Sequence, residues 1–402
     1  MTNTLISSTP PTRPLFRITN LWREEKARGV LIQVLVMAGF FAAIAWLIGN
    51  VMANFAALDK SFGFGFLWEL PANYDINQTL IDYNSQDTHA RAALVGLINT
   101  GLVAILGIVI ATVLGFTLGA MRLSSNWLVA KFAYCFVEFT RNVPVLLHIL
   151  LWHGIIIHTL PHPRQALGLG NSIFLSNRGF YIPRPVFEDG AWVLFAALIV
   201  GIAIAVLVRR HAKTIRDTTG RSIPVFWIGA IAIIGLPAIA YVAAGTPVSF
   251  ELPAFRGFNY QGGLTLIPEL VALTWALSIY TAAFIAENVR GGILAVHKGQ
   301  REAAESLGLR PNRVLTLVVL PQALRVIIPP LTSQYLNLTK NSSLAIAIGY
   351  MDLVATLGGI TLNQTGREME SMLLVMLIYL AISLFIASLM NWFNRSVRLI
   401  ER

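Results

Sequence analysis

Long uncharged apolar segments alternate with short polar segments along most of the chain. A helix needs about 20 apolar residues to cross a bilayer. Eight segments are predicted to cross, and they cover residues 29–58, 92–121, 131–159, 190–208, 222–250, 270–286, 326–351 and 371–394. The pattern therefore predicts an all-α integral membrane protein with about eight transmembrane helices.

The seventh of these segments is interrupted. Pro329 and Pro330 lie in its first half, and Lys340 divides the apolar sequence before it resumes at Asn341. Proline removes a backbone donor and bends helices. An ionisable residue at membrane depth is costly and is a candidate for function. We therefore expect a broken helix here.

Lysine and arginine are unevenly distributed between alternate polar segments. With the N-terminus inside, the inside segments 1–28, 122–131, 209–221, 287–321 and 395–402 hold 5, 2, 5, 5 and 3 of them. The outside segments 59–91, 160–189, 251–269 and 352–370 hold 2, 3, 1 and 1. Because these residues favour the cytoplasmic side, both termini are predicted to be cytoplasmic.

The composition agrees with a membrane protein. Of 402 residues, 55% are hydrophobic and 12% are charged, whereas a soluble domain has about 25% charged residues. The net charge of +10 follows from the cytoplasmic excess of Lys and Arg, so it does not indicate nucleic acid as a partner. The single Cys135 excludes an intramolecular disulfide and a cysteine-based metal site.

A polar stretch at residues 298–321 is predicted to form two short helices. Gly308 is expected to end the first in the left-handed conformation, and Pro311 suits the first turn of the second. So small a pair cannot bury an apolar face alone. The face is predicted to pack on the membrane surface, on its own domain or on another protein, and it consists of Leu307, Val314, Leu315 and Val318.

This stretch resembles the EAA loop of the membrane subunits of bacterial ABC importers. The match consists of Glu302, Ala303, Ala304, Gly308, Leu320 and Pro321, with Val318 where isoleucine is usual. The resemblance implies that residues 298–321, Pro311 included, form the cytoplasmic coupling loop that contacts an ATPase subunit.

Three further motifs resemble the polar amino-acid permeases of that family. The first begins at Glu138 and includes Arg141 and Pro144. The second begins at Ala286 and includes Glu287 and Arg290. The third begins at Leu336 and includes Lys340 and Gly349. The resemblance covers residues 92–159 and 266–395. It implies a type I ABC importer transmembrane domain at 92–395, with inserted helices around 190–250, preceded by a cytoplasmic segment (1–28), an extra transmembrane helix (29–58) and a periplasmic loop (59–91).

The long N-terminal region and the inserted pair are similar to the larger permease subunits of general L-amino-acid importers. This resemblance implies import of amino acids by alternating access in the bacterial inner membrane. It also implies three kinds of partner: a second, homologous permease subunit, two cytoplasmic ATPase subunits and a periplasmic amino-acid-binding protein. The chain has no G-x-x-x-x-G-K-[ST] sequence for a nucleotide phosphate. No cofactor is expected in this chain, because ATP and Mg would bind to the partner ATPase.

Several charged residues have both a structural and a functional interpretation. Glu138 with Arg141 and Glu287 with Arg290 have the i, i+3 spacing of simple helix-surface pairs, or they belong to a gate. Lys340, with Asn341, Ser342 and Ser343, either lines the translocation path or extends to the outer interface.

Two other classes of function remain open. A stand-alone secondary transporter or channel would need carboxylates within the spans, which hold almost none besides Glu138. A membrane-embedded enzyme would need a catalytic cluster, and none is evident. No metal site is expected from His148, His153, His158 and His162, because Pro161 separates the one i, i+4 pair. The substrate itself cannot be identified from these residues.

Overall fold

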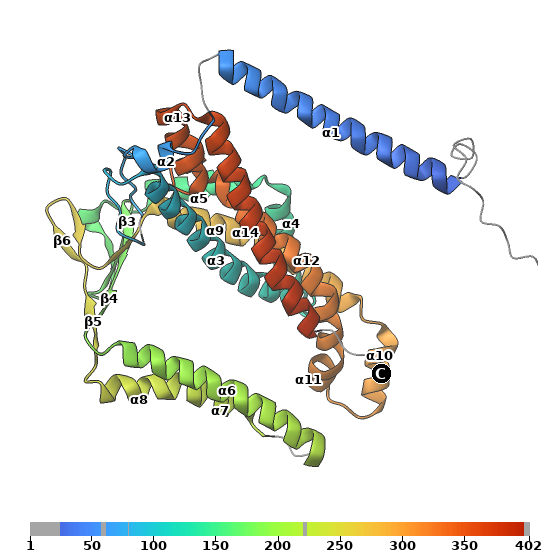
Figure 1. The fold of residues 1–402 in the computed structure, drawn as a ribbon. Coiled ribbons are helices and arrows are strands. Elements are labelled where there is room, and N and C mark those ends of the chain that lie inside the picture. Colours follow the sequence, from blue (N-terminus) through green and yellow to red (C-terminus); the bar gives the residue numbers. More distant parts are fainter. Residues whose placement is uncertain (1–24, 58–61, 79, 220–222, 398–402) are drawn as a thin grey trace, which may run out of the picture. The chain divides into compact units, whose positions relative to one another are not determined.

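The computed structural model describes residues 25–57, 62–78, 80–219 and 223–397 (Figure 1). The chain divides into two units, residues 1–64 and residues 65–402. The first contains helix α1 (Glu25–Ala57), whose side chains are largely exposed. Most of the predicted cytoplasmic segment 1–28 lies outside the described residues.

The second unit is mainly helical. Its helices are α2 (Phe66–Glu69), α3 (His89–Arg122), α4 (Trp127–Asn142), α5 (Val145–Thr159), η2 (Pro163–Gln165), α6 (Trp192–Thr219), α7 (Val225–Ala230), η3 (Ile231–Gly235), α8 (Leu236–Ala243), α9 (Pro268–Leu294), α10 (Lys298–Ser306), α11 (Pro311–Val314), η4 (Leu315–Val319), α12 (Leu320–Asn341), η5 (Ser342–Ile348), η6 (Val354–Thr361), α13 (Leu362–Thr365) and α14 (Glu368–Val397). Within the described residues, seven helices are long and apolar enough to cross a membrane, and α4 with α5 makes an eighth if that bent pair is one span. The prediction of about eight crossings is confirmed.

The third predicted segment is not the single helix that was expected. It divides into α4 and α5, which are bent by 107°. Val143 between them is extended, with φ −99° and ψ 131°. A residue before proline is disfavoured in the helical conformation, so Pro144 accounts for the break.

The expected break in the seventh segment takes the form of a change of helix type after Lys340, because Pro311–Ile348 forms one continuous helical span. The α-helix α12 ends at Asn341, and the 3-10 helix η5 follows it directly. Gly349 caps η5 in the left-handed conformation, with φ 78°. Pro329 and Pro330 lie inside α12 without interrupting it. The change of helix type therefore follows Lys340 and does not occur at the prolines.

The two loops predicted at residues 160–189 and 251–269 contain strands. β1 (Leu167–Leu169), β2 (Ile173–Ser176), β3 (Gly179–Ile182) and β8 (Leu264–Leu266) form an antiparallel sheet in the order β1-β2-β3-β8. β4 (Arg184–Phe187) pairs with β5 (Val248–Glu251), and β6 (Ala254–Arg256) pairs with β7 (Asn259–Gln261). The fifth predicted segment, 222–250, was also too long, because α8 ends at Ala243.

The inserted helices form a hairpin that begins and ends at the β4–β5 ribbon. α6 packs along α7, η3 and α8 (Figure 1). Gly201 allows close packing, because a Cβ there would lie 2.4 Å from the carbonyl oxygen of Ala232. The hairpin is therefore one packed element.

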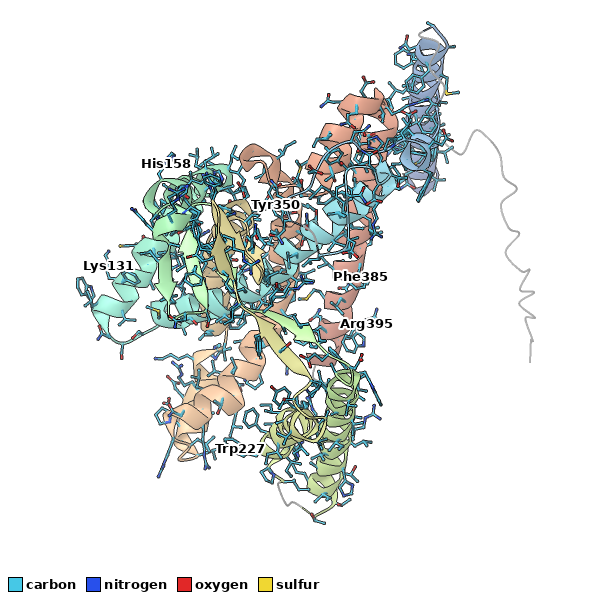
Figure 2. All side chains as sticks on the ribbon, turned by 90° about the vertical axis from the view of Figure 1, so that its left-hand side faces the viewer. Lys131, His158, Trp227, Tyr350, Phe385 and Arg395 are labelled. Atoms are coloured by element: carbon cyan, nitrogen blue, oxygen red, sulfur yellow. The ribbon has the colours of Figure 1, made fainter. Side chains whose placement is uncertain are left out.

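Helix α9 forms the centre of the second unit. It packs against α3, α4, α5 and α12 and is mostly buried. Side chains such as Phe385 on α14 and Trp227 on α7 are about 70% and 67% exposed at the surface, whereas Tyr350 is buried (Figure 2). Apolar exposure of this extent is expected where lipid surrounds a protein.

Glycines of α3 set the distance between α3 and α9. A Cβ at Gly115 would lie 2.6 Å from Cβ of Ile285, and one at Gly119 would lie 2.7 Å from Cβ of Val289. A Cβ at Gly101, on the same helix, would meet no atom within 4 Å. Close approach of α3 to α9 therefore depends on Gly115 and Gly119.

We expect Gly115→Ala to destabilise the protein by about 1–3 kcal/mol, because the added methyl group overpacks the α3–α9 contact. The matched variant Gly101→Ala should be neutral or stabilising by up to about 1 kcal/mol, since alanine suits a helix better than glycine. Thermal unfolding in detergent measures both. Equal melting temperatures for the two variants would contradict the proposed packing.

Candidate functional site

The segment at residues 298–321 has the predicted two-helix conformation. α10 is followed by Leu307 and by Gly308, whose φ is +75°. Pro311 begins α11, which continues through one π-helical turn, η4, into α12. The predicted end of the first short helix and the predicted start of the second are confirmed, but the second does not end within the segment, because it continues into α12.

The apolar contacts of this segment differ from those predicted. Ala304, Val314 and Val319 are buried together, with Ile293 of α9 and Val296, just after α9, beside them. The predicted face is divided instead. Val314 and Val318 belong to this cluster, but Leu307 is 82% exposed and Leu315 42% exposed. The pair packs on its own domain and leaves Leu307 free for another surface.

The residues of the motif lie mostly on the solvent side of α10. Glu302 and Ala303 are exposed, and Lys298 pairs with Glu302 at 3.3 Å, while Ala304 is buried. Leu320 and Pro321 lie at the start of α12 and are exposed. The segment therefore presents a surface with both charged and apolar side chains beside α9 and α12.

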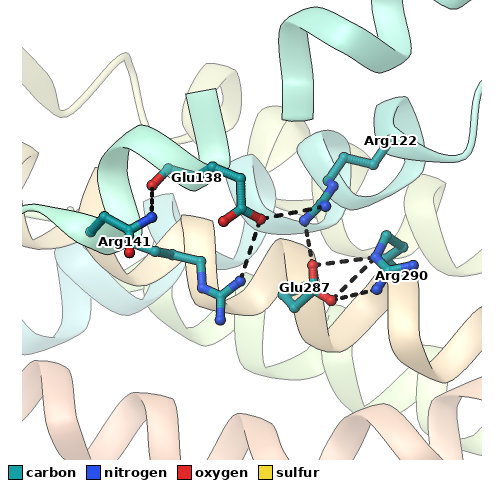
Figure 3. A network of polar contacts seen from close by, with 6 residues as sticks. Arg122, Glu138, Arg141, Glu287 and Arg290 are labelled. Atoms are coloured by element: carbon teal, nitrogen blue, oxygen red, sulfur yellow. Dashed lines mark hydrogen bonds and ion pairs between the residues drawn. The ribbon is translucent and has the colours of Figure 1, made fainter. Parts of the chain in front are cut away.

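The two predicted charge pairs lie together in one network (Figure 3). Arg290 donates two hydrogen bonds to Oε1 of Glu287, at 2.6 and 3.2 Å. Arg141 lies 3.7 Å from Glu138. Each of these four side chains is about one-third exposed. These four residues lie on α4 and α9.

Arg122 at the end of α3 joins the two pairs. It hydrogen bonds to Glu287 and lies 3.7 Å from Glu138, and its side chain is 8% exposed. Sequence reasoning assigned Arg122 only to a cytoplasmic turn. Arg122 and Glu287 were both predicted to lie at the cytoplasmic end of a membrane helix, and this shared depth was the sequence signal that they could meet. Arg122 thus links α3, α4 and α9, and α9 leads directly into the segment at 298–321.

Lys340 lies at the edge of a cavity between α12 and α14. The cavity has a volume of about 440 Å³ and is lined by Lys340, Ser343, Val354, Val375, Met376, Tyr379, Leu380 and Ser383. Lys340 is exposed, and no ion pair found within the described residues involves it. The ammonium group is therefore accessible from this cavity.

The structure brings only part of the predicted polar group to Lys340. Ser343 lines the same cavity, although its hydroxyl donates to the carbonyl oxygen of Lys340. Ser342 is buried and donates to the carbonyl of Thr339, and Asn341 is half-buried. Tyr379 of α14, which was not predicted, lines the same cavity.

Asp352 is a second residue that sequence reasoning missed. It is fully buried, accepts a hydrogen bond from Tyr379 at 3.2 Å and accepts one from the amide of Ala355 at 2.8 Å. Burial raises the pKa of this carboxyl to about 6. The sequence placed it at the start of an outside segment, where it was not expected to be buried. The hydrogen bond to Asp352 therefore holds Tyr379 in the wall of the Lys340 cavity.

The histidines of α5 do not assemble a metal site. His148 lies 3.2 Å from the carbonyl oxygen of Thr140. His153 lies 3.7 Å from Glu269, so one of these histidines has a carboxylate beside it. Within the described residues no group of three or more His, Cys, Asp or Glu could hold a metal ion.

Comparison with known proteins decides the family. Residues 218–399 match the model of the binding-protein-dependent transport system inner membrane component. The general L-amino acid transport system permease protein AapQ of Rhizobium johnstonii is 44% identical over 402 residues, which covers 100% of both chains. This chain belongs to the inner-membrane permeases of binding-protein-dependent transport systems.

A second full-length relative agrees with this assignment. The glutamate/glutamine/aspartate/asparagine transport system permease protein BztB of Rhodobacter capsulatus is 45% identical over 428 residues, covering 99% of this permease and 100% of BztB. A solved structure of an amino acid ABC transporter with histidines aligns with 77% of this permease and 95% of that chain, at 21% identity and a TM-score of 0.45. The resemblance inferred from the four motifs is confirmed, and the permease is a multi-pass inner-membrane protein.

We expect Arg122→Gln to destabilise this permease by about 1–3 kcal/mol, because Glu287 and Glu138 then lose a charged donor in a partly buried place. The double variant Arg122→Gln/Glu287→Gln should lose less stability than the sum of its single variants, because each single variant leaves one charged side chain without its partner. Thermal unfolding of the three variants measures this coupling. Strict additivity would show that Arg122 does not join the network energetically.

Proposed function

We propose that this chain is the transmembrane permease subunit of an ATP-driven importer that moves amino acids, of broad L-specificity, from the periplasm to the cytoplasm. The end-to-end match with AapQ at 44% identity carries the proposal. The family is a transport component without catalytic activity of its own. ATP and Mg bind to a separate ATPase subunit, since this chain lacks a P-loop sequence.

The segment at residues 298–321 transmits the motion of the ATPase. Closure of two ATPase subunits on ATP displaces α10. The buried cluster of Ala304, Val314 and Val319 joins α10 to α11 and to η4, which continues into α12, and Ile293 of α9 packs against this cluster. The network around Arg122 holds the cytoplasmic end of α9 to α3 and α4. Displacement of α10 is thereby passed to the helices that enclose the path, and Glu287, Arg290, Glu138 and Arg141 form its cytoplasmic gate.

Lys340 acts on the substrate during passage. Its ammonium group lies at a cavity that also has hydroxyl groups and an apolar wall. An amino acid carries a carboxylate that such a cation attracts. A path needs walls from two subunits, so a second, homologous permease subunit completes it. A periplasmic amino-acid-binding protein delivers the substrate.

Affinity purification of the tagged permease from its native membrane tests this function. An ATPase subunit should co-purify, and its hydrolysis of ATP should increase when the loaded periplasmic binding protein is added. A permease that purifies alone from gently solubilised membranes, and that shows no ATPase activity in the purified fraction, would contradict the proposal.

A further inference from the structure

The inserted hairpin has a helical extension on its cytoplasmic side. α6 has 28 residues, which is about 42 Å at ~1.5 Å per residue, whereas the hydrocarbon core is about 30 Å thick. Its apolar part, residues 192–208, and the return helices at 225–243 are each close to the thickness of that core. Residues 209–219 therefore continue α6 beyond its apolar part, without a break in the helix.

The extension is strongly cationic. Its sequence contains Arg209, Arg210, Lys213 and Arg216 with a single carboxylate, Asp217. The side chains of Arg209, Arg210 and Arg216 are exposed. No ion pair found within the described part of the chain involves these three arginines. Their charges are thus available to an external anion.

The extension has two distinct faces. Ala212 is 7% exposed and Ile215 is half-buried, so this face packs within the hairpin. Arg209 and Arg216 have the i, i+7 spacing that places residues on one face of a helix, and Arg210 lies next to Arg209 at the end of the apolar part. The cations therefore form a stripe that rises from the end of the apolar part.

We propose that this stripe binds the anionic headgroups of phospholipids in the cytoplasmic leaflet. Arg209 and Arg210 follow the last apolar residue, Val208, so they lie at headgroup level. Arg216 lies about 10 Å further along the helix, within about one Debye length of the headgroup phosphates. A basic segment next to the cytoplasmic end of a spanning helix has the charge and position that anionic lipid attracts. The lipid fixes the depth of a hairpin whose helices pack mainly with each other.

Native mass spectrometry of the permease, purified from its native membrane with its co-purifying subunits, tests this proposal. After delipidation it is offered equal amounts of phosphatidylglycerol and phosphatidylcholine. The wild type should retain at least about threefold more phosphatidylglycerol. The triple variant Arg209→Gln/Arg210→Gln/Arg216→Gln should lose most of this preference, whereas the corresponding triple Lys variant should keep it.

A matched control removes the same charge elsewhere. Arg164→Gln/Arg178→Gln/Arg184→Gln changes three arginines of the strand-rich segment and should keep the preference for phosphatidylglycerol. Inorganic phosphate at 10-fold excess over the lipid should not displace phosphatidylglycerol if the site needs a lipid. Equal retention by the wild type and the first variant, equal loss in the control, or displacement by phosphate would each overturn the proposal.

Two further readouts separate lipid binding from other effects of charge. Thr218→Cys, in a background without Cys135, should react with an impermeant thiol reagent only after permeabilisation, in both the wild type and the Gln variant. The single variant Arg216→Gln, which keeps Arg209 and Arg210, should lose part of the preference for phosphatidylglycerol and keep this labelling pattern. Loss of a co-purifying subunit, with unchanged phosphatidylglycerol, would instead identify the stripe as a protein contact.

Discussion

The variant Gly308→Val should abolish most substrate uptake while the protein still inserts into the membrane. Gly308 has a φ of +75°, a conformation that costs a non-glycine residue about 1–2 kcal/mol and a β-branched residue more. A Cβ at Gly308 would meet no atom within 4 Å, so the effect is purely conformational. Relief of the strain turns α10 relative to α11 and misplaces the exposed Leu307. We expect uptake to fall at least about tenfold.

Gly291 supplies the control for this prediction. It also has open space for a Cβ, but it lies in helix α9 and has no positive φ. Gly291→Val should keep most of the uptake. Measurement of uptake in cells, together with the amount of ATPase that co-purifies, distinguishes the variants. Normal uptake and normal co-purification of the ATPase in Gly308→Val would refute the coupling role of this segment.

The variant Lys340→Met should reduce uptake strongly without loss of assembly. Methionine has a similar length but no charge, so the cavity keeps its apolar wall while the carboxylate of the substrate loses its attraction to the ammonium group. Loss of one charged hydrogen bond between this ammonium group and the substrate carboxylate costs about 1.5–3 kcal/mol, which is roughly 10- to 150-fold in rate. Lys340→Arg, which keeps the charge, should retain more uptake.

Co-purification of the ATPase distinguishes a role of Lys340 in transport from a role in folding. The ATPase should co-purify with Lys340→Met in normal amount, and the affinity of the separate binding protein for its substrate should not change. Lys131→Met, a change at an exposed lysine on α4, should leave uptake unchanged. Wild-type uptake by Lys340→Met would remove Lys340 from the path, and failure to assemble would make it a structural residue.

The sequence predicted those features that depend on local chemistry. The eight apolar segments, the left-handed Gly308 and the N-terminal Pro311 each depend on residues within one or two helical turns. The bend between α4 and α5 also had a local signal, at Val143 and Pro144. It was missed because the apolar pattern continues across the bend.

Features that depend on distant residues were not predictable in the same way. β3 pairs with β8 through Phe180 and Leu266, and the whole inserted hairpin lies between these residues in sequence. Strands of three or four residues carry too little pattern to be recognised. Arg122 meets Glu287, and Tyr379 meets Asp352, only because α3, α9, α14 and the segment before η6 pack together. The site therefore gained these residues from the tertiary structure.

Reconstitution into liposomes tests whether this permease belongs to an ATP-driven importer. The permease, its companion subunit and the ATPase are placed in liposomes with ATP inside, and the periplasmic binding protein with a radiolabelled L-amino acid is supplied outside. Uptake should require both ATP and the binding protein, and it should continue when ionophores abolish proton and sodium gradients. Uptake by the permease alone, driven by an ion gradient without ATP, would contradict the account and would identify the protein as a secondary transporter.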